Sequence, residues 1–313
     1  MKDGASVYVA GHRGLVGSAI CRALADRGIR SLVTRTSVEL DLREQAAVER
    51  FFAEQRPEYV FLAAARVGGI YANDTYPADF IRDNLQIQTN VIDAAWRHGA
   101  RKLCFLGSSC IYPRMAPQPI PEDSLLTGPL EKTNEWYAIA KIAGIKMCQA
   151  YSKQHGFNAI SLMPTNLYGP GDNFDPLGSH VIPGLIGKFH AAKTAGDDAV
   201  TVWGTGTPRR EFLYVDDLAD AACHLMETYD SPEIVNVGVG EDVTIAELAD
   251  LVRHVVGFEG RLEYDRSKPD GTPRKLLDVS RLKSLGWRPR VGLEDGLRRT
   301  YDWYVRHVAD AAA

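Results

Sequence analysis

The sequence predicts an α/β protein built on a doubly wound parallel sheet, with a second, smaller α/β domain. A short apolar run at residues 5–10 is followed at once by three glycines spaced three residues apart. Strand-like runs then alternate with helix-like stretches. After Pro164 the composition changes, because Gly and Pro become frequent. At 313 residues the chain can bury a large core and form two lobes.

The predicted sheet comes from apolar runs at 5–10, 31–34, 59–63, 102–107 and 159–163. Their alternation with helical patterns is typical of a parallel sheet covered by helices on both faces. Ligands of such sheets bind beyond the carboxyl ends of the strands. Gly11, Ala63–Ala65 and Ser108 all follow strand-like runs, so we expect one crevice to receive them.

The second half of the chain predicts the smaller lobe. Gly and Pro punctuate 169–184, a helical stretch runs through about 194, and 201–214 has the pattern of a strand and a loop. We expect a Rossmann-type nucleotide-binding domain at 1–165 plus about 212–229. The substrate-binding domain is expected at about 166–211 plus 230–313.

The first glycines predict a dinucleotide site. They follow a buried strand and open a helical pattern that runs through Ala25. Small residues there let the backbone approach a pyrophosphate, and the first helical amides point toward it. A tight turn without a ligand is the alternative. The expected contacts are Gly11, His12, Arg13, Gly14, Leu15, Val16 and Gly17.

Tyr137 and Lys141 form the second signal. Positions four apart share one face of a helix, so the ammonium can lie beside the phenol. We expect the cation to lower the tyrosine pKa from its usual value of about 10. Ser108, at a strand end, could hydrogen-bond the same substrate oxygen. The spacing also occurs by chance on amphipathic helices, but the order of strand, glycines, serine, tyrosine and lysine favours catalysis.

Composition excludes several classes of protein. The formal charge of −4 is small and scattered, which gives no footprint for nucleic acid or an anionic membrane. No apolar run approaches the roughly 18–20 residues of a membrane span, and residues 1–10 lead directly into the first strand. We therefore expect a cytoplasmic protein with no secretory signal. Five cysteines without metal-type spacing predict free thiols, no disulfide and no metal.

Several motifs together narrow the function. They are Gly11–Gly14, Gly107–Pro113, Tyr137–Gly144, Met163–Pro170, Ser179–Pro183 and Lys268–Lys275. Over nearly the whole chain they resemble the GDP-L-fucose synthases of the extended short-chain dehydrogenase/reductase family. The resemblance implies a 3,5-epimerisation and a 4-ketone reduction of GDP-4-keto-6-deoxy-D-mannose, with Ser108, Tyr137 and Lys141 as the reductase triad.

The expected cofactor is NADP(H). The second strand ends in Thr34-Arg35-Thr36-Ser37, with no carboxylate before Glu39 to bind a ribose 2′-hydroxyl. Arg35 and Arg13 could clamp a 2′-phosphate, although solvated surface is the alternative for either. Related sequences carry a further arginine where Ser37 stands, so a less strict preference for NADPH over NADH is expected here. The remaining implied cofactor contacts are Leu106, Gly107, Lys141, Pro164, Asn166, Leu167 and His180.

Epimerisation beside a ketone needs a base and an acid on opposite faces of the sugar. Cys110 as base and His180 as acid are the pair that the resemblance implies. Thiol and imidazole, with reference pKa values of about 8.5 and 6.5, both exchange protons near neutrality. The alternatives are inert packing for the cysteine and a surface position for the histidine. The direction of each proton transfer is open from sequence.

Recognition of a GDP-sugar requires cations for the diphosphate and a wall for the guanine. Lys188, Trp203, Arg210 and Asp278 are the matching positions, with Lys275 and Asp270 nearby. Trp203 in a lobe core and Lys188 on a solvated helix are the alternatives.

Two long helices are expected at about 78–98 and 136–155. Apolar residues cover more than one stripe of the first helix: Ile81, Leu85, Ile87, Val91, Ile92 and Ala95. A buried helix in a monomer would also explain them, but the resemblance implies a homodimer through these helices.

Two other functions fit parts of the pattern. A sugar-nucleotide 4-epimerase or 4-reductase would share the nucleotide domain and the triad. A dinucleotide-sensing binding protein would keep the domain, but such proteins commonly lack the Tyr137–Lys141 pair.

Overall fold

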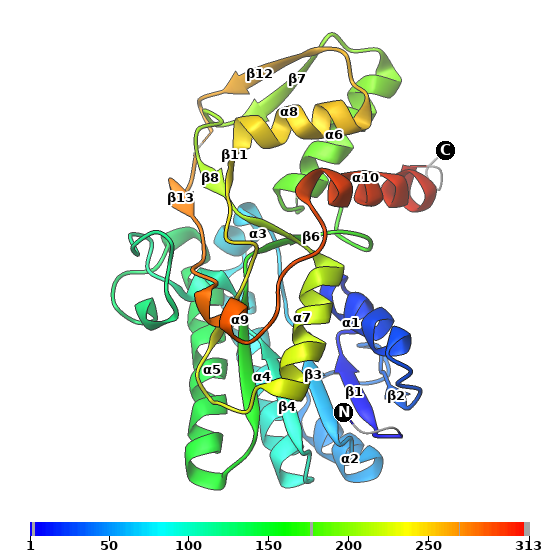
Figure 1. The fold of residues 1–313 in the computed structure, drawn as a ribbon, viewed down its shortest axis with the longest axis vertical. Helices are drawn as coiled ribbons and strands as arrows, with labels where there is room; N and C mark the ends of the chain where they lie inside the picture. Colours follow the sequence, from blue (N-terminus) through cyan, green and yellow to red (C-terminus); the bar gives the residue numbers. More distant parts are fainter. Residues whose placement is uncertain (2–3, 176–177, 269, 310–313) are drawn as a thin grey trace.

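A six-stranded parallel sheet forms the larger lobe of this computed structural model, which describes residues 1, 4–175, 178–268 and 270–309 (Figure 1). The strand order is β10-β5-β4-β3-β1-β2, and every neighbouring pair is parallel. The strands are β1 (Val7–Ala10), β2 (Leu32–Val33), β3 (Tyr59–Leu62), β4 (Lys102–Leu106), β5 (Ala159–Pro164) and β10 (Val235–Val237). The expected fold class is confirmed.

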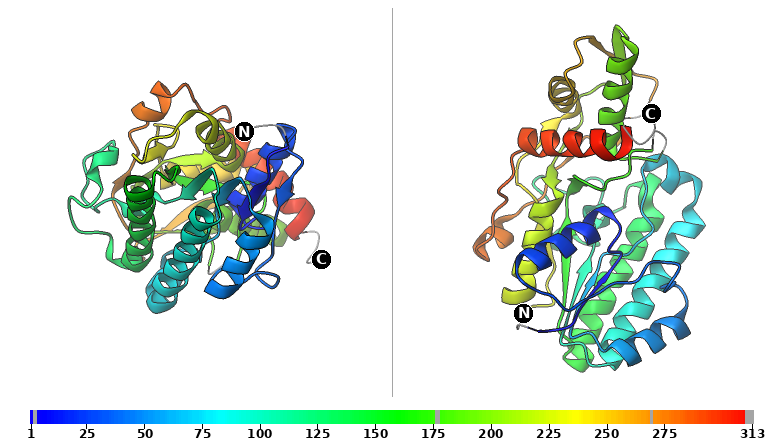
Figure 2. Two further views of the ribbon diagram at one scale, coloured as in Figure 1. Left: turned by 90° about the horizontal axis from the view of Figure 1, so that it is seen from below. Right: turned by 90° about the vertical axis from the view of Figure 1, so that its right-hand side faces the viewer.

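The central strands are buried on both faces. All residues of β1, β4 and β5 are buried. Such continuous apolar runs suit a parallel sheet that helices cover on both sides. On one side lie α2 (Gln45–Gln55), α4 (Pro77–Arg97) and α5 (Glu135–His155), and on the other α1 (Leu15–Asp26) and α7 (Val215–Thr228), as Figure 2 shows.

The order of the strands places a crevice above the sheet. From β1 the chain moves to β2 on one side and then to β3 on the other, so the winding reverses between β1 and β3. The carboxyl ends of β1 and β3 lie in register, with Ala10 opposite Leu62. Ligands of doubly wound sheets bind at this switch point.

The smaller lobe packs around its own apolar cluster above that edge (Figure 1). Its helices are α6 (Val181–Ala195), α8 (Ile245–Val256) and α10 (Leu293–Tyr304). Its strands are β6 (Asn166–Tyr168) with β9 (Phe212–Tyr214), β7 (Ala199–Trp203) with β12 (Arg261–Asp265), and β8 (Arg209–Arg210) between β11 (Val243–Thr244) and β13 (Arg274–Lys275). Thr244 and Glu247 form a capping box that begins α8.

Shorter elements connect these parts. They are α3 (Ile70–Thr75), α9 (Ser280–Ser284), the 3₁₀ turns Ser109–Ile111, Glu122–Ser124 and Lys132–Asn134, and a π-helical turn at Val305–Ala309. Among the described residues, no helix combines the length and the hydropathy needed to cross a membrane.

Two segments pack differently from the expected domain division. Residues 230–313 were expected in the substrate domain, but β10 pairs with β5 in the parallel sheet, from Val235 opposite Leu162 to Val237 opposite Pro164. Val279 and Leu282, around α9, also belong to the apolar core of the larger lobe. Short strands without a strong apolar run gave no sign of this return. The other boundaries of the division stay a prediction.

Candidate active site

The glycine turn between β1 and α1 is tight for two different reasons. Gly11 has a φ of +85°, and a Cβ there would lie 2.8 Å from the backbone of Ala64. A Cβ on Gly17 would lie 2.1 Å from the carbonyl oxygen of Gly11. A Cβ on Gly14 would meet only that same oxygen, at an ordinary 3.5 Å. The chain's own packing thus requires the outer glycines, whereas Gly14 leaves open space of the kind that a pyrophosphate would use.

The start of α1 is suited to an anion. Gly14 is the N-cap, no side chain caps the first turn, and that turn contains no acidic residue. The first helical N–H groups, from Leu15 to Gly17, therefore have no intrahelical acceptors. Nδ1 of His12 is buried without a hydrogen-bond partner. A phosphate oxygen would satisfy these donors, so the turn fits the dinucleotide that the sequence predicts.

The positive charges of Arg13 and Arg35 both affect Glu39, in the segment after β2. Arg35 lies 5.6 Å from the centroid of the Phe51 ring and donates to the Thr34 carbonyl at 2.8 Å. Hydrogen bonds from Thr36 lower the pKa of Glu39, and the charges of Arg35 and Arg13 add to this effect. Both arginines thus lie close enough to act on the same carboxylate. The carboxylate that the sequence placed just beyond this position lies within their field.

The reductase triad assembles at the end of β4 and along α5. Ser108 hydrogen-bonds Tyr137, and Lys141 lies 5.8 Å from the centroid of the Tyr137 ring. The Lys141 ammonium donates to the carbonyl of Leu106 at 2.8 Å. A Cβ on Gly107 would lie 2.4 Å from the Met163 side chain, so this strand end can only be glycine without repacking.

The expected lowering of the Tyr137 pKa is wrong for this structure. Burial raises that pKa, the neighbouring Cys110 adds to the rise, and the Ser108 hydrogen bond only partly opposes it. Burial also lowers the pKa of Lys141, to about 8. Lys141 lies beside the Tyr137 ring as expected, but desolvation of the phenol sets the direction of the shift.

Cys110 and His180 come from distant parts of the chain to the same place. The Cys110 Sγ accepts from Asn134 Nδ2 at 3.4 Å and from Lys275 Nζ at 3.5 Å. His180 is the N-cap of α6. Burial lowers the pKa of its imidazole, and the positive charge of Lys275 lowers it further. Lys275 therefore links the expected base to the expected acid.

The end of β5 forms the floor next to these groups. Pro164 ends the strand, and Thr165 donates its backbone N–H to Val237 at 3.0 Å. Asn166 Nδ2 donates to the carbonyl of Glu211 at 2.8 Å. Leu167 pairs with Leu213 in the β6–β9 ladder. The predicted cofactor contacts on this segment are thus held by β10 and by residues 211–213.

The expected sugar-nucleotide residues divide into two groups. Trp203 is 56% exposed, which is at odds with a place in the lobe core, and Lys188 Nζ lies 4.6 Å from its ring centroid. Burial lowers the pKa of Lys188 and of Arg210. Asp278 instead accepts from the Ser280 N–H at 2.8 Å, just before α9. Among the described residues, no contact joins Asp278 to the other three.

Sequence reasoning missed one buried carboxylate. Glu211 is 0% exposed and accepts backbone N–H groups of Val239 at 2.6 Å and Gly240 at 2.7 Å through one oxygen, and of Leu277 at 3.1 Å through the other. It therefore ties β10 and the segment after β13 to the floor beneath Asn166. A glutamate directly before the apolar run Phe212–Val215 was the available signal.

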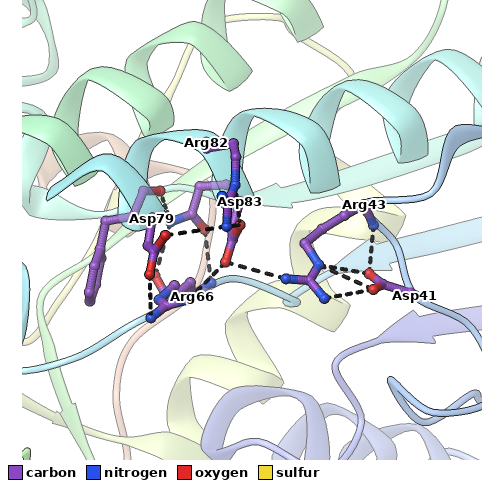
Figure 3. Close-up of polar contacts among 8 residues, drawn as sticks. Asp41, Arg43, Arg66, Asp79, Arg82 and Asp83 are labelled. Atoms are coloured by element: carbon purple, nitrogen blue, oxygen red, sulfur yellow. Dashed lines mark hydrogen bonds and ion pairs between the residues drawn. The ribbon is translucent and has the colours of Figure 1, made fainter. Parts of the chain in front are cut away.

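A charged network fixes the loop after β3, and it was also missed (Figure 3). Asp83 on α4 is 3% exposed and accepts from Arg66 at 2.9 Å and Arg82 at 2.8 Å. Arg43 lies 3.7 Å from the same carboxylate and pairs with Asp41. The backbone of Arg66 is held by Asn84, which donates to its carbonyl and accepts from its N–H. The network anchors the strand end that packs against Gly11.

Comparisons with known proteins show which family the chain belongs to and which proteins it is similar to. Residues 7–238 match the NAD dependent epimerase/dehydratase family. The chain is 65% identical over 306 residues to GDP-L-fucose synthase 1 of Arabidopsis thaliana, covering 98% of this chain and 95% of that protein. It is 56% identical over 310 residues to GDP-L-fucose synthase of Escherichia coli strain K12, covering 96% and 97%. A GDP-L-fucose synthetase from Naegleria fowleri, solved with NADP bound, superposes with a TM-score of 0.91 at 28% identity, covering 99% of this chain and 96% of that one.

Proposed function

Because the chain belongs to the NAD dependent epimerase/dehydratase family, we propose that it converts GDP-4-keto-6-deoxy-D-mannose into GDP-L-fucose, with NADPH as the reductant. One observation carries the proposal. Cys110 and His180 meet around Lys275, while Cys110 also adjoins the Ser108–Tyr137 pair. A simple reductase needs only the triad, so the added thiol and imidazole support epimerisation as well.

The proposed cofactor site runs from the glycine turn to the end of β5. The turn at Gly11–Gly17 would hold the pyrophosphate, and Arg13 with Arg35 the 2′-phosphate. Bound there, NADPH supplies the hydride that reduces C4 of the sugar. Lys141 and Asn166 lie along the same edge and would orient the nicotinamide end.

Epimerisation is assigned to the thiol and the imidazole. As a thiolate, Cys110 takes the proton from C3, the C–H bond breaks, and its electron pair moves onto the 4-oxygen as an enolate. Tyr137 and Ser108 donate hydrogen bonds to that oxygen. His180, as an imidazolium, returns a proton to the opposite face of the carbon. The same exchange at C5 completes the inversion before reduction.

Reduction is assigned to Tyr137. As hydride reaches C4, the 4-oxygen gains negative charge and takes the phenolic proton. Lys141 stabilises the phenolate that results, and Ser108 holds the oxygen in line.

The guanine and the diphosphate are assigned to the smaller lobe. The exposed ring of Trp203 offers a stacking surface, and Lys188 and Arg210 offer cations. For Asp278 the structure supports a role at the start of α9, so its contact with substrate is the weakest part of this assignment.

We also propose a cytoplasmic homodimer formed through α4 and α5. Apolar side chains remain open on the outer face of α5, where Trp136 is 43% and Ile139 37% exposed. A second copy of the same helices would cover them. The five free cysteines support a reducing compartment. Sedimentation of the Ile139→Glu variant as a monomer, with the wild type as a dimer, would support the interface.

The decisive experiment mixes the protein with NADPH and GDP-4-keto-6-deoxy-D-mannose. We expect loss of the reduced cofactor and GDP-L-fucose as the product by NMR. A 4-epimerase that recycles its own hydride would show no net loss of NADPH, and a sensing protein would bind NADPH without turnover. In D₂O the wild type should incorporate deuterium at C3 and C5, and Cys110→Ser should not.

A further inference from the structure

Lys275 makes the closest charged contact with the proposed base. Its Nζ lies 3.5 Å from the Cys110 Sγ, which also accepts from Asn134 Nδ2 at 3.4 Å. An ammonium and an amide that both donate to one sulfur stabilise negative charge that develops on it, because an anionic sulfur is a far better acceptor than a thiol.

The backbone on either side of Lys275 is held in place. In β13, Lys275 pairs with Arg210 of β8. The next residue, Leu276, donates its N–H to Gln118 Oε1 at 2.9 Å and accepts from the Ile120 N–H at 2.8 Å. The backbone from which the Lys275 side chain reaches Cys110 is therefore fixed by strand pairing and by the 118–120 loop.

Among the residues that the structure describes, the carboxylate near Lys275 is paired with other cations. The preceding Arg274 pairs with Asp242 at 2.5 Å, and Arg209 pairs with the same carboxylate at 2.8 Å. Within the described residues, Lys275 forms no salt bridge and its side chain is half-buried. The Cys110 sulfur is the acceptor that the Lys275 ammonium contacts instead.

We propose that Lys275 is part of the proton-transfer centre, where its ammonium hydrogen-bonds the Cys110 sulfur and stabilises the negative charge that this sulfur carries when it acts as the base. The inference rests on the proposed function. It adds a group to the Cys110–His180 pair and gives a structural reason for Cys110 to act as the base.

The same charge acts in opposite ways on the two partners. Beside Cys110 it stabilises a negative thiolate, which makes that side the base. At His180, burial lowers the pKa of the imidazole and the charge of Lys275 lowers it further, so the ring, once protonated, gives up its proton more readily. After one inversion the thiol holds the proton from carbon and the imidazole has lost one, so exchange with water restores the starting pair.

The test uses Lys275→Met, Lys275→Arg and the neighbouring control Arg274→Met. The first readout is the rate at which iodoacetamide alkylates Cys110 at pH 7, followed by peptide mass mapping with Cys110→Ser as the blank. We expect Lys275→Met to slow alkylation about tenfold or more, since a unit charge at contact distance is removed. Lys275→Arg should restore most of the rate, and Arg274→Met should match the wild type.

The second readout is deuterium uptake at C3 and C5 of the substrate, which should fall in parallel while thermal midpoint and NADPH affinity stay unchanged. Wild-type alkylation in a folded Lys275→Met variant would overturn the proposal. A loss equal in Lys275→Met and Lys275→Arg would also overturn it, because packing and not charge would then be responsible. If the wild type neither exchanges deuterium nor oxidises NADPH, the proposed function fails, whereas the alkylation series still decides the role of Lys275.

Discussion

Alanine substitutions at Gly17 and Gly14 should have different effects. The first should lower the stability of the fold, and the second should weaken NADPH binding. Gly17→Ala places a Cβ 2.1 Å from the carbonyl oxygen of Gly11 and 2.9 Å from the Cα of His12. Both contacts are backbone atoms, so the turn must open by about 1 Å, and a cost near the upper end of about 1–3 kcal/mol follows for overpacking. At about 2 °C per kcal/mol in a chain of this size, the thermal midpoint should fall by about 6 °C.

Gly14→Ala should leave the fold intact. Its Cβ meets only the Gly11 carbonyl oxygen at 3.5 Å, and its φ of −78° suits alanine. The added methyl would occupy the open space over the turn, so NADPH should bind more than about tenfold more weakly, a loss of about 1.4 kcal/mol. Differential scanning fluorimetry measures the first effect and NADPH titration by fluorescence the second. Wild-type affinity in a folded Gly14→Ala variant would refute the placement of the pyrophosphate.

Three further predictions follow from charged groups. Burial raises the pKa of Asp83, but hydrogen bonds from Arg82 and Arg66 outweigh it and lower the pKa, so its stabilisation is present above about pH 4 and is lost in acid. Asp83→Asn should lower the free energy of unfolding, measured in urea, by about 1–2 kcal/mol at pH 7 and by little at pH 3. Equal urea midpoints for the variant and the wild type at pH 7 would contradict this. Burial raises the pKa of Asp172 to about 7, so the protein should lose stability as pH rises from about 4 toward 7, and Asp172→Asn should remove that slope in thermal scans. Lys141, with a pKa of about 8, should give a fall in kcat/KM above that pH, and Lys141→Arg should shift the fall upward.

The core of the larger lobe could be predicted because its strands are continuous apolar runs. The expected strands at 102–107 and 159–163 correspond closely to β4 and β5, and the expected helices at 78–98 and 136–155 to α4 and α5. In contrast, β10 is three residues long and joins the sheet only through tertiary pairing with β5. Nothing local in so short a segment distinguishes a sheet strand from a loop.

Some residues of the site could also be predicted from local sequence, and others could not. The glycine turn and the Ser108, Tyr137 and Lys141 positions follow from local spacing on one strand end and one helix. Lys275 beside Cys110 does not, because 165 residues separate them in the sequence. Asp83 was hidden for another reason. A charged residue on a helix usually faces solvent, and only the convergence of arginines from three segments keeps this one buried.

The error over Tyr137 has a chemical consequence. A cation one helical turn away was expected to lower the phenol pKa, but burial raises it, and burial lowers the pKa of Lys141 to about 8. The two shifts keep the proton on the phenol and bring the ammonium near its titration point. Reduction of a ketone needs a proton donor at the oxygen, and a phenol that stays protonated until charge develops there supplies one. The lysine then matters most after transfer, when it neutralises the phenolate. Tyr137→Phe should therefore suppress NADPH oxidation strongly and slow deuterium uptake at C3 and C5 much less, because Ser108 still donates to the enolate oxygen and Cys110 and His180 remain. An equal loss of both activities would show that the phenol is the main donor to the enolate.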